Sequence, residues 1–429
     1  MVKKKAGTIT FAIGLIIVGA LLFAENFTTL PIKDFYKYWP VLLIGLGAEF
    51  LIFSIIYSRG SENVRISIDG LCVVFIIIMG LASNMGNIMN FDLHLGDKGK
   101  SLLDFNSNYK AEMKESFARE DVSANYNIKE IKISNDFGEI EVKPSDSKFV
   151  KVEAEMEVKY NDEIKAREYI KNAINIEEGE LTEISVNLPS DGSKKDFSKA
   201  IVNFTIFIPD VEKVNVETSF GDINVADIKG ELTVNNNYGA VVVNRITGNI
   251  IVKNSFGKIN VSDINGDAKI NNQNGQISVE KVTGSAQLET HFGGVKAKNI
   301  DANLTVENNN GSIEVDGVGS NADVKGSFGS IDVKDINGNL EVKNSNGRIG
   351  VKDVDANVNI KNSFGSIDYV SNNIKDADIL VKTDFGNIRC DEGINITKSG
   401  QQSKAEGKTG SGKNKIQITN TNGDININD

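Results

Sequence analysis

The stretch SFGSIDVKDINGNLEVKN, residues 327–344, is one of a series of 18-residue repeats, and SFGKINVSDINGDAKINN at 255–272 is another. A glycine marks each repeat, and these markers are Gly221, Gly239, Gly257, Gly275, Gly293, Gly311, Gly329, Gly347 and Gly365, with a further one, Gly386, 21 residues later. A short period kept without insertion is typical of repeat proteins, in which each unit packs on its neighbours.

Positions in the repeat are counted from the marker glycine as position 1. The consensus G-x-I-x-V-x-x-I-x-G-x-L-x-V-x-N-S-F places apolar residues at positions 3, 5, 12 and 14, which are Ile223, Val225, Leu232 and Val234 in the first repeat. Alternation of apolar and polar residues predicts half-buried strands. Gly and Asn between them predict turns. Each repeat is therefore expected to form two short strands.

Two all-β architectures fit this pattern. A constant period favours a β-solenoid of about nine rungs, in which parallel strands stack about 4.8 Å apart and each rung covers the next. An antiparallel meander is the alternative, because Asn-Gly pairs such as Asn274-Gly275 are strong hairpin signals. A single meander would leave its apolar face uncovered. No proline follows Pro209 to interrupt a strand ladder.

Two further positions carry a pattern. Position 16 is Asn or Thr in nearly every repeat, which predicts a hydrogen-bonded ladder of stacked side chains; the residues are Thr218, Asn236, Asn254, Asn272, Thr290, Asn308, Asn344 and Asn362. Position 18 alternates, with Phe at 220, 256, 292, 328 and 364 and with Tyr238, Asn274, Asn310 and Asn346 between them. This alternation indicates either a duplicated two-rung unit or large and small residues that alternate along one corner.

Residues 1–90 differ in class. Three apolar spans, near 8–24, 39–57 and 66–85, are each about long enough to cross a bilayer. A signal peptide is disfavoured, because no small-residue cleavage site follows the first span. A small excess of Lys and Arg places the N-terminus inside the cell, so residues 90–429 are expected outside the cytoplasm. The sequence thus predicts a multi-pass protein of the cell membrane, with the lipid bilayer as a partner.

Glu49 lies near the middle of the second span. A carboxylate inside a bilayer is unfavourable, so it is a candidate functional residue by default. The alternative is a protonated glutamate that is hydrogen-bonded to a neighbouring helix.

The expected domains are a three-helix transmembrane anchor at 1–90, a polar stalk at 91–126, a capping β region at 127–215 and the β-solenoid at 216–429. The stalk has the pattern of a helix at 108–119, and the capping region has that of a helix at 161–176 and of strands within 128–158, at 180–188 and at 201–208. Residues 397–413 are expected to be a flexible polar loop. The final stretch, 415–429, restates the repeat and is expected to close the stack.

Composition argues against several kinds of chemistry. The formal net charge is −11 without a basic patch, so no nucleic-acid partner is expected. Two cysteines, Cys72 and Cys390, and two histidines, His94 and His291, offer no disulfide framework, metal cluster or histidine-based catalysis. Cys390 falls at position 5 and is expected in the core. We therefore predict no catalytic residue, no metal ligand and no cofactor.

Three motifs resemble known sites only in part. Residues 407–413, GKTGSGK, nearly match a phosphate-binding loop, but Asn414 replaces the Ser or Thr that would hold Mg²⁺. The Asp-Phe-Gly triplets at 136–138 and 384–386 are interpreted as repeat corners, because no kinase partners accompany them. The half repeat lacks the G-G-x-G-x-D runs of a calcium β-roll.

Two stretches carry family resemblances. NFTIFIPDVEKVNVETSFGDINVADIKG (203–230), with ISNDFGEIEVKPSD (133–146) upstream, resembles the bacterial putative-adhesin family of β-strand repeat proteins, a domain of unknown function, over roughly 125–429. YWPVLLIGLGAEFLI (38–52) is similar to the membrane region of Lia-type envelope-stress proteins, in which Trp-Pro opens the second helix of a pair, as Trp39-Pro40 does here. The resemblance to the Lia-type proteins implies an envelope location and stress sensing or signalling, and it implies no catalytic residues.

The first functional hypothesis is a non-enzymatic, membrane-anchored envelope protein that presents its solenoid face to a protein or polysaccharide partner. The second is a regulator or sensor of envelope stress acting on a membrane signalling partner, with Glu49 in the contact. A cytoplasmic scaffold follows if the membrane orientation is reversed. An enzyme would need carboxylates clustered at one height of the solenoid, which the regular repeat does not supply.

Overall fold

The computed structural model describes residues 2–6, 64–68, 109–189, 196–390 and 394–428. The chain forms two compact units, Met1–Asn108 and Tyr109–Asp429. In the first unit the described elements are β1 (Val2–Ala6) and β2 (Val64–Ile68), which pair in parallel. Among the described residues, no helix is long and apolar enough to span a bilayer.

The predicted membrane anchor falls almost wholly on other residues. Glu49 and the spans near 8–24 and 39–57 lie outside the described residues, as does 69–85 of the third span. Residues 66–68, where that third span was expected to begin, form the end of β2.

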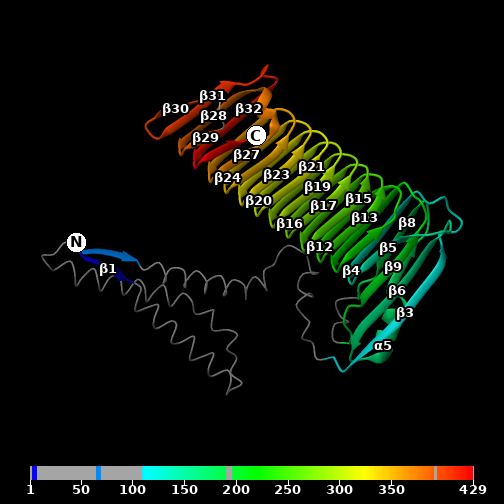
Figure 1. Ribbon diagram of the computed structural model, residues 1–429. Coiled ribbons are helices and arrows are strands. Elements are labelled where there is room, and N and C mark those ends of the chain that lie inside the picture. Colours follow the sequence, from blue (N-terminus) through cyan, green and yellow to red (C-terminus); the bar gives the residue numbers. More distant parts are fainter. Residues whose placement is uncertain (1, 7–63, 69–108, 190–195, 391–393, 429) are drawn as a thin grey trace. The chain divides into compact units, whose positions relative to one another are not determined.

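The second unit is a stack of parallel strands in two long sheets (Figure 1). Each repeat gives one strand to each sheet, and neighbouring strands pair with a register shift of 18 residues, as in Ile277 opposite Val295 and Ala286 opposite Leu304. The predicted β-solenoid is confirmed and the meander is wrong. The Asn-Gly pairs do not fold hairpins, because each one turns the chain from the first sheet into the second.

The first sheet has 16 strands, which in spatial order are β30 (Asn395–Ser399), β31 (Gln402–Lys408), β28 (Ala377–Phe385), β32 (Asn414–Asn422), β26 (Val358–Phe364), β24 (Leu340–Asn346), β22 (Ala322–Phe328), β20 (Leu304–Asn310), β18 (Ala286–Phe292), β16 (Ala268–Asn274), β14 (Ile250–Phe256), β12 (Glu231–Tyr238), β10 (Lys213–Phe220), β4 (Glu130–Phe137), β8 (Leu181–Val186) and β7 (Ile174–Glu177).

The second sheet has 15 strands, which in spatial order are β29 (Ile388–Cys390), β33 (Ile425–Asn428), β27 (Ile367–Val370), β25 (Ile349–Val354), β23 (Ile331–Ile336), β21 (Ile313–Val318), β19 (Val295–Ile300), β17 (Ile277–Val282), β15 (Ile259–Asn265), β13 (Val241–Thr247), β11 (Ile223–Ala226), β5 (Ile140–Pro144), β9 (Ile201–Ile208), β6 (Val150–Tyr160) and β3 (Ala111–Val122).

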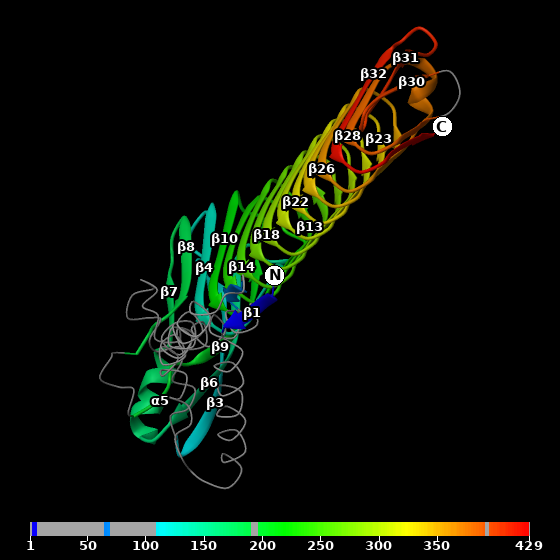
Figure 2. The same ribbon diagram turned by 90° about the vertical axis from the view of Figure 1, so that its left-hand side faces the viewer.

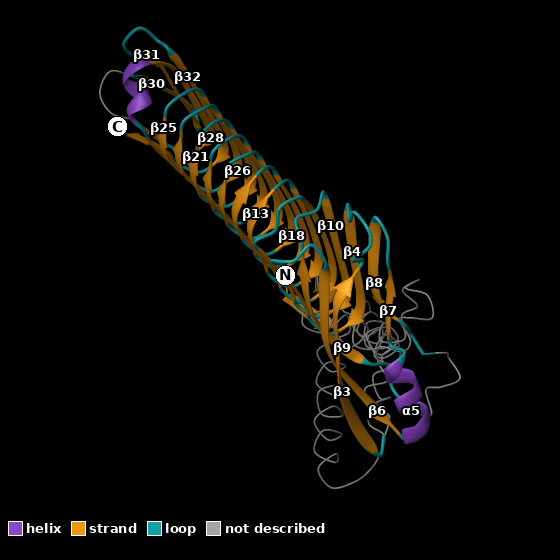
Figure 3. Cartoon of the chain, turned by 90° about the vertical axis from the view of Figure 1, so that its right-hand side faces the viewer, coloured by secondary structure: helices purple, strands orange, loops and turns teal. Residues whose placement is uncertain are grey.

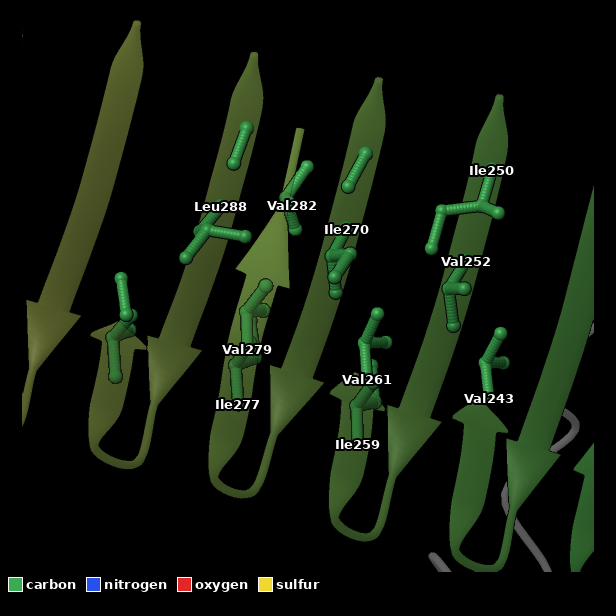
Figure 4. Close-up of a cluster of buried hydrophobic side chains, with 14 of the residues drawn as sticks. Val243, Ile250, Val252, Ile259, Val261, Ile270, Ile277, Val279, Val282 and Leu288 are labelled. Carbon is green, nitrogen blue, oxygen red and sulfur yellow. The ribbon is translucent and has the colours of Figure 1, made fainter. Parts of the chain in front are cut away.

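The core lies between the two sheets, as Figure 4 shows for buried residues of adjacent rungs such as Ile250, Ile259 and Ile277. Positions 3, 5, 12 and 14 are buried as predicted, for example Ile277, Val279 and Leu288. Position 8 is buried too, as Val282 is, because position 7 adopts a left-handed backbone (φ +58° at Lys281) that reverses which face the next side chain takes. Every rung therefore covers its neighbours with apolar side chains, which is the main stabilising contribution.

The N-terminal end of the stack differs from the prediction at residues 108–119. These residues enter strand β3, an antiparallel edge strand on β6, and not a helix. The residues are good helix formers, but pairing along β6 overrides that preference, and the charged outer side chains suit a sheet edge. The helix predicted at 161–176 is present as α5 (Glu163–Lys171), capped by Asp162, while 174–177 form β7.

At this end the rung of β4 and β5 lies between that of β8 and β9 and the first repeat strands, β10 and β11 (Figure 2). The strands predicted within 128–158, at 180–188 and at 201–208 are thus present, as β4 to β6, β8 and β9.

At the C-terminal end, a 3-10 helix, η4 (Asn372–Asp376), lets the chain skip one rung (Figure 3). β28 and β29 form the outermost rung, and β32 and β33 then insert between it and the rung of β26 and β27. The stretch predicted to close the stack therefore fills the gap instead, as far as it is described, over residues 415–428.

The loop predicted at 397–413 is largely a hairpin of β30 and β31, which covers the free edge of β28. Its inward residues Ser403 and Ala405 are small and buried. A polar sequence can still form an edge strand, because its outer face is solvated.

Candidate binding surface

The residues at position 18 form a row along the corner where each first-sheet strand turns into the second sheet. We call this row the corner row. Strand pairing gives its spatial order as Phe137, Phe220, Tyr238, Phe256, Asn274, Phe292, Asn310, Phe328, Asn346, Phe364, Asn422 and Phe385. From Phe256 onward, Phe and Asn alternate at every rung.

The alternation continues through the inserted strand. Along the chain, Phe364 is followed by Phe385 without an Asn at an 18-residue interval, but in space Asn422 of β32 lies between them. Asn422 comes 37 residues after Phe385 in the sequence, in a strand that is inserted later. Duplication of a two-rung unit would not account for an asparagine at this place in the row. The structure therefore favours the second explanation, in which large and small residues alternate by their place along the corner.

The row has two parts that differ in packing. Phe137, Phe220, Tyr238 and Phe256 stack ring on ring, with centroid distances of 5.5, 4.7 and 4.9 Å between successive rings. The phenylalanines beyond them stand apart and are more exposed, with exposed fractions of 56% for Phe292, 57% for Phe328, 53% for Phe364 and 52% for Phe385. We call this second part, Phe292 to Phe385, the aromatic comb.

Asparagines at position 16 hold the corner below the comb. Asn308 Nδ2 donates to the carbonyl oxygen of Gly293 at 2.9 Å, and Asn344 Nδ2 to that of Gly329 at 3.0 Å. The predicted side-chain ladder is therefore wrong at this position, because each buried amide reaches the backbone of the preceding rung. A true ladder occurs at position 11, where Asn339 Nδ2 donates to Asn321 Oδ1 at 3.1 Å.

Marker glycines allow successive corners to stack closely. A Cβ on Gly329 would lie 2.2 Å from the carbonyl oxygen of Gly311, and Gly329 has a φ of +136°. Only glycine fits both requirements. The position of every comb residue is thus fixed by the glycine that follows it.

The comb is flanked mostly by uncharged polar residues. On one side, in spatial order, lie His291, Asn309, Ser327, Ser345, Ser363, Thr421 and Asp384, and on the other Gly294, Ser312, Ser330, Arg348, Ser366, Asp424 and Asn387. Arg348 is paired with Asp368 at 2.9 Å and Asp332 at 3.3 Å, and the carboxylates Asp384 and Asp424 lie at the Phe385 end. Net charge is therefore low beside the comb between Phe292 and Phe364.

Several charges elsewhere on the solenoid are paired between rungs. Arg245 binds Asp227 through two hydrogen bonds of 2.5 and 2.6 Å, and this guanidinium lowers the pKa of the Asp227 carboxyl below its usual range. Lys281 lies 3.3 Å from Asp263 in the same column of side chains. Such pairs link adjacent rungs and do not gather carboxylates at one height.

The glycine-rich stretch 407–413 surrounds an internal carboxylate. Asp376 Oδ1 accepts hydrogen bonds from Ser411 N at 2.6 Å, Ser411 Oγ at 2.8 Å and Gly412 N at 2.8 Å. The Ser411 hydroxyl is the main cause of the lowered pKa of Asp376, and the backbone N–H groups add to it. The backbone amides that resemble a phosphate-binding loop thus face Asp376, and this stretch is held in place rather than flexible.

The remaining residues singled out from the sequence do not converge. Glu49, Cys72 and His94 lie outside the described residues. Cys390 is half-buried against the core at position 5, and His291 is exposed next to Phe292. Both Asp-Phe-Gly triplets are repeat corners, since Phe137 and Phe385 belong to the corner row. Among the described residues, no three His, Cys, Asp or Glu side chains gather as a metal site would require.

Sequence reasoning found the alternation but did not identify the comb as a surface. Its signal was the strict recurrence of a large apolar residue at a turn, where polar residues are usual.

Comparison with known proteins gives two family matches. Residues 9–51 match the LiaI-LiaF-like transmembrane region, which associates the chain with a membrane. Residues 128–321 and 267–428 match the Toastrack DUF4097 family, and together these ranges cover more than half of the chain. No curated protein matches the chain.

Solved structures described as adhesion proteins align along most of their length. A putative cell adhesion protein from Clostridium sporogenes ATCC 15579 is 12% identical, with 74% of this chain and 99% of that one covered and a TM-score of 0.17. A putative adhesin from Parabacteroides distasonis ATCC 8503 is 13% identical, with 74% and 97% covered and a TM-score of 0.27. A putative adhesin from Bacteroides fragilis NCTC 9343 is 12% identical, with 75% and 98% covered and a TM-score of 0.19.

The family match covers the two-sheet stack apart from β3 and agrees with the resemblance read from 203–230. The chain belongs to the Toastrack DUF4097 family.

Proposed function

We propose that this chain is a non-enzymatic, membrane-anchored envelope protein whose β-solenoid presents a binding surface to a partner outside the cytoplasm. The observation that carries the proposal is the aromatic comb, in which phenylalanines more than half exposed recur on a rigid corner. Exposed aromatic residues in a regular array are unfavourable in water and typical of binding sites. The LiaI-LiaF-like match supports the membrane anchor.

The proposal places the stack outside the cytoplasm, and cysteine labelling tests this. Lys361 is an exposed residue of β26 that points away from the core. Lys361→Cys would be made in a background carrying Cys72→Ala and Cys390→Val, and intact cells would be treated with a membrane-impermeant maleimide. Labelling before lysis is expected. Labelling only after lysis would contradict the proposal and favour a cytoplasmic scaffold.

A regulator or sensor of envelope stress is the second candidate, and the match of 9–51 to the LiaI-LiaF-like region favours it. Glu49, which falls within that match, would then contact a membrane signalling partner. Crosslinking in cells followed by purification of the full-length chain tests this. Recovery of one membrane signalling protein, lost on Glu49→Leu and kept on Glu49→Gln, would support the regulator.

A further inference from the structure

The comb repeats every second rung, and its spacing limits what can bind along it. Strands in the stack are about 4.8 Å apart, so successive comb phenylalanines lie on the order of 10 Å apart. From Phe292 to Phe385 the comb crosses six strand spacings and is about 29 Å long. A ligand that contacts every ring must therefore be long and must repeat over two rungs.

The comb is too narrow for a stable protein interface. A strip about 30 Å long and about 10 Å wide offers roughly 300 Å². Stable protein complexes bury about 800 Å² per partner. A second copy of this chain or a globular partner would need much additional contact, whereas a linear polymer would be covered along its whole length.

The chemistry beside the rings indicates an uncharged ligand with many hydroxyl or amide groups. The side-chain amides of Asn346 and Asn422, which separate the comb phenylalanines, have no hydrogen-bond partner among the described residues. Ser327, Ser345 and Ser363 add hydroxyls along one flank. Sugars present apolar C–H faces to aromatic rings and hydroxyls to amides, so this combination suits a neutral polysaccharide.

The period agrees with that class. In an extended β-linked glycan, successive sugars are related by a half turn, so every second sugar presents the same face. Two rungs span on the order of 10 Å, which is close to the length of two such sugars. Each comb phenylalanine would then stack on every second sugar, and each intervening Asn would face the sugar between.

Other linear polymers fit less well. An extended peptide repeats over about 6.8 Å for two residues, which does not match two rungs. A polyproline II peptide repeats over about 9.3 Å, but such peptides bind in grooves that contact two of their three edges. The comb stands on a corner where the chain reverses between sheets, so it offers a ridge.

From these observations we propose that the aromatic comb, Phe292 to Phe385, binds a linear, neutral, β-linked glycan along the axis of the stack. This inference rests on the proposed function, in which the solenoid presents a binding surface, and it names the class of ligand and the residues that contact it. The rings supply stacking on alternate sugars, and Asn346 and Asn422 supply amides between them; Asn310 Nδ2 also donates to the His291 carbonyl at 3.3 Å, which leaves its amide oxygen and second N–H for a ligand.

The test uses variants that exchange the two residue types of the row. Phe328→Asn with Phe364→Asn removes two comb rings and introduces a residue that neighbouring rungs already carry at position 18, so the fold is expected to persist. Ile251→Asn, which removes an apolar residue that is 40% exposed on the sheet face, is the matched control. Circular dichroism of each full-length variant in detergent micelles verifies folding.

Binding would be measured by co-sedimentation with insoluble cellulose and with chitin. We expect the wild-type chain to be retained, the double variant to bind about tenfold more weakly and the Ile251→Asn variant to bind as wild type does. Equal retention of the double variant, or no retention of the wild type on either polymer, would overturn the proposal. Binding to a poly-L-proline peptide instead, or self-association lost in the double variant, would overturn it as well.

A parallel binding assay on isolated cell envelopes distinguishes a failure of the glycan site from a failure of the proposed function. Envelope binding by both the wild type and the double variant would overturn the glycan site and leave the proposed function standing. Failure of the wild type to bind envelopes would contradict the proposed function itself.

Discussion

Position 7 of the repeat sets which side chains reach the core, because its backbone is left-handed, with φ of +56° at Asp263 and +52° at Asp353. Asp tolerates this conformation better than most residues, and glycine, present at Gly317, tolerates it without penalty. A β-branched residue does not.

We therefore expect Asp353→Val to lower the free energy of unfolding by about 1–2 kcal/mol, while Asp353→Gly leaves it nearly unchanged. Thermal unfolding of the full-length chain in detergent, followed by circular dichroism, measures both. Asp355→Val is the control, because Asp355 is exposed and its φ is not positive. Equal melting temperatures for the two Asp353 variants would show that position 7 is not strained.

The amide at position 16 should matter through its backbone hydrogen bond. Asn308→Ala removes the donor to the Gly293 carbonyl and leaves that partly buried oxygen without this partner. Such losses destabilise by about 1–3 kcal/mol. Asn308→Thr should not restore the bond, since Thr218 and Thr290, at the same position, have no hydrogen-bond partner for Oγ1. If either variant unfolds at the denaturant concentration of the wild type, the hydrogen bond contributes little.

These two positions also mark what the sequence could predict. The period and the apolar residues at 3, 5, 12 and 14 favour a parallel stack over a meander, because stacked rungs cover the apolar face of every strand. The left-handed residue at position 7 could not be predicted, since Asp, Arg, Lys and Asn there read as ordinary surface residues. The ladder expected at position 16 was wrong. The repeat pattern predicts that Asn308 stacks on the side chains of neighbouring rungs, but it does not show whether a side-chain oxygen or the Gly293 carbonyl oxygen is the nearer acceptor.

Among the elements, the stretch 407–413 depends on one carboxylate. The folded-state pKa of Asp376 is lowered, mainly by the Ser411 hydroxyl. Its stabilising contribution is therefore present above the unfolded pKa of about 3.9 and is lost as pH falls through the lower folded-state pKa.

Hydrogen exchange read by mass spectrometry, corrected for the intrinsic effect of pH, checks this. Protection of 407–413 should be full at pH 6 and fall as the solution is acidified below about pH 4. Asp376→Ala should abolish the protection at every pH, whereas Asp355→Ala, which removes an exposed carboxylate, should leave it intact. Unchanged protection in Asp376→Ala would mean that the hairpin of β30 and β31 holds the loop by itself.

The terminal elements could be predicted less well than the repeats. β3 reads as a helix because its pairing partner β6 is not visible in its own sequence. The insertion of β32 and β33 is equally hidden, since 415–429 fits any rung of the stack. The sequence contains the repeat but not the order in which the last rungs assemble.

That insertion predicts a local effect of truncation. Ending the chain after Lys413 removes β32 and β33 and leaves β28 without its parallel neighbour. We expect residues 377–408 to lose hydrogen-exchange protection, while repeats as distant as β14 keep theirs, because each rung contacts only its neighbours. Protection of 377–408 in the truncated chain would show that β28 can pair directly with β26.

Over the whole stack, the repeat allows rungs to be removed in phase. Deleting 293–310 removes one rung and deleting 293–328 removes two, and both leave the 18-residue register intact. Both shortened chains should therefore fold with nearly wild-type melting temperatures. They differ in the corner row, because the first deletion places Phe292 directly beside Phe328, whereas the second keeps Phe292 next to Asn346 and preserves the alternation.

If the comb acts through its two-rung period, the two deletions should separate in cellulose and chitin co-sedimentation. The two-rung deletion loses one ring and should bind only a few-fold more weakly than the wild type. The one-rung deletion keeps every comb phenylalanine but breaks their spacing, and it should bind more weakly than the two-rung deletion. Weaker binding by the two-rung deletion would mean that the number of rings decides affinity and that the period along the corner does not.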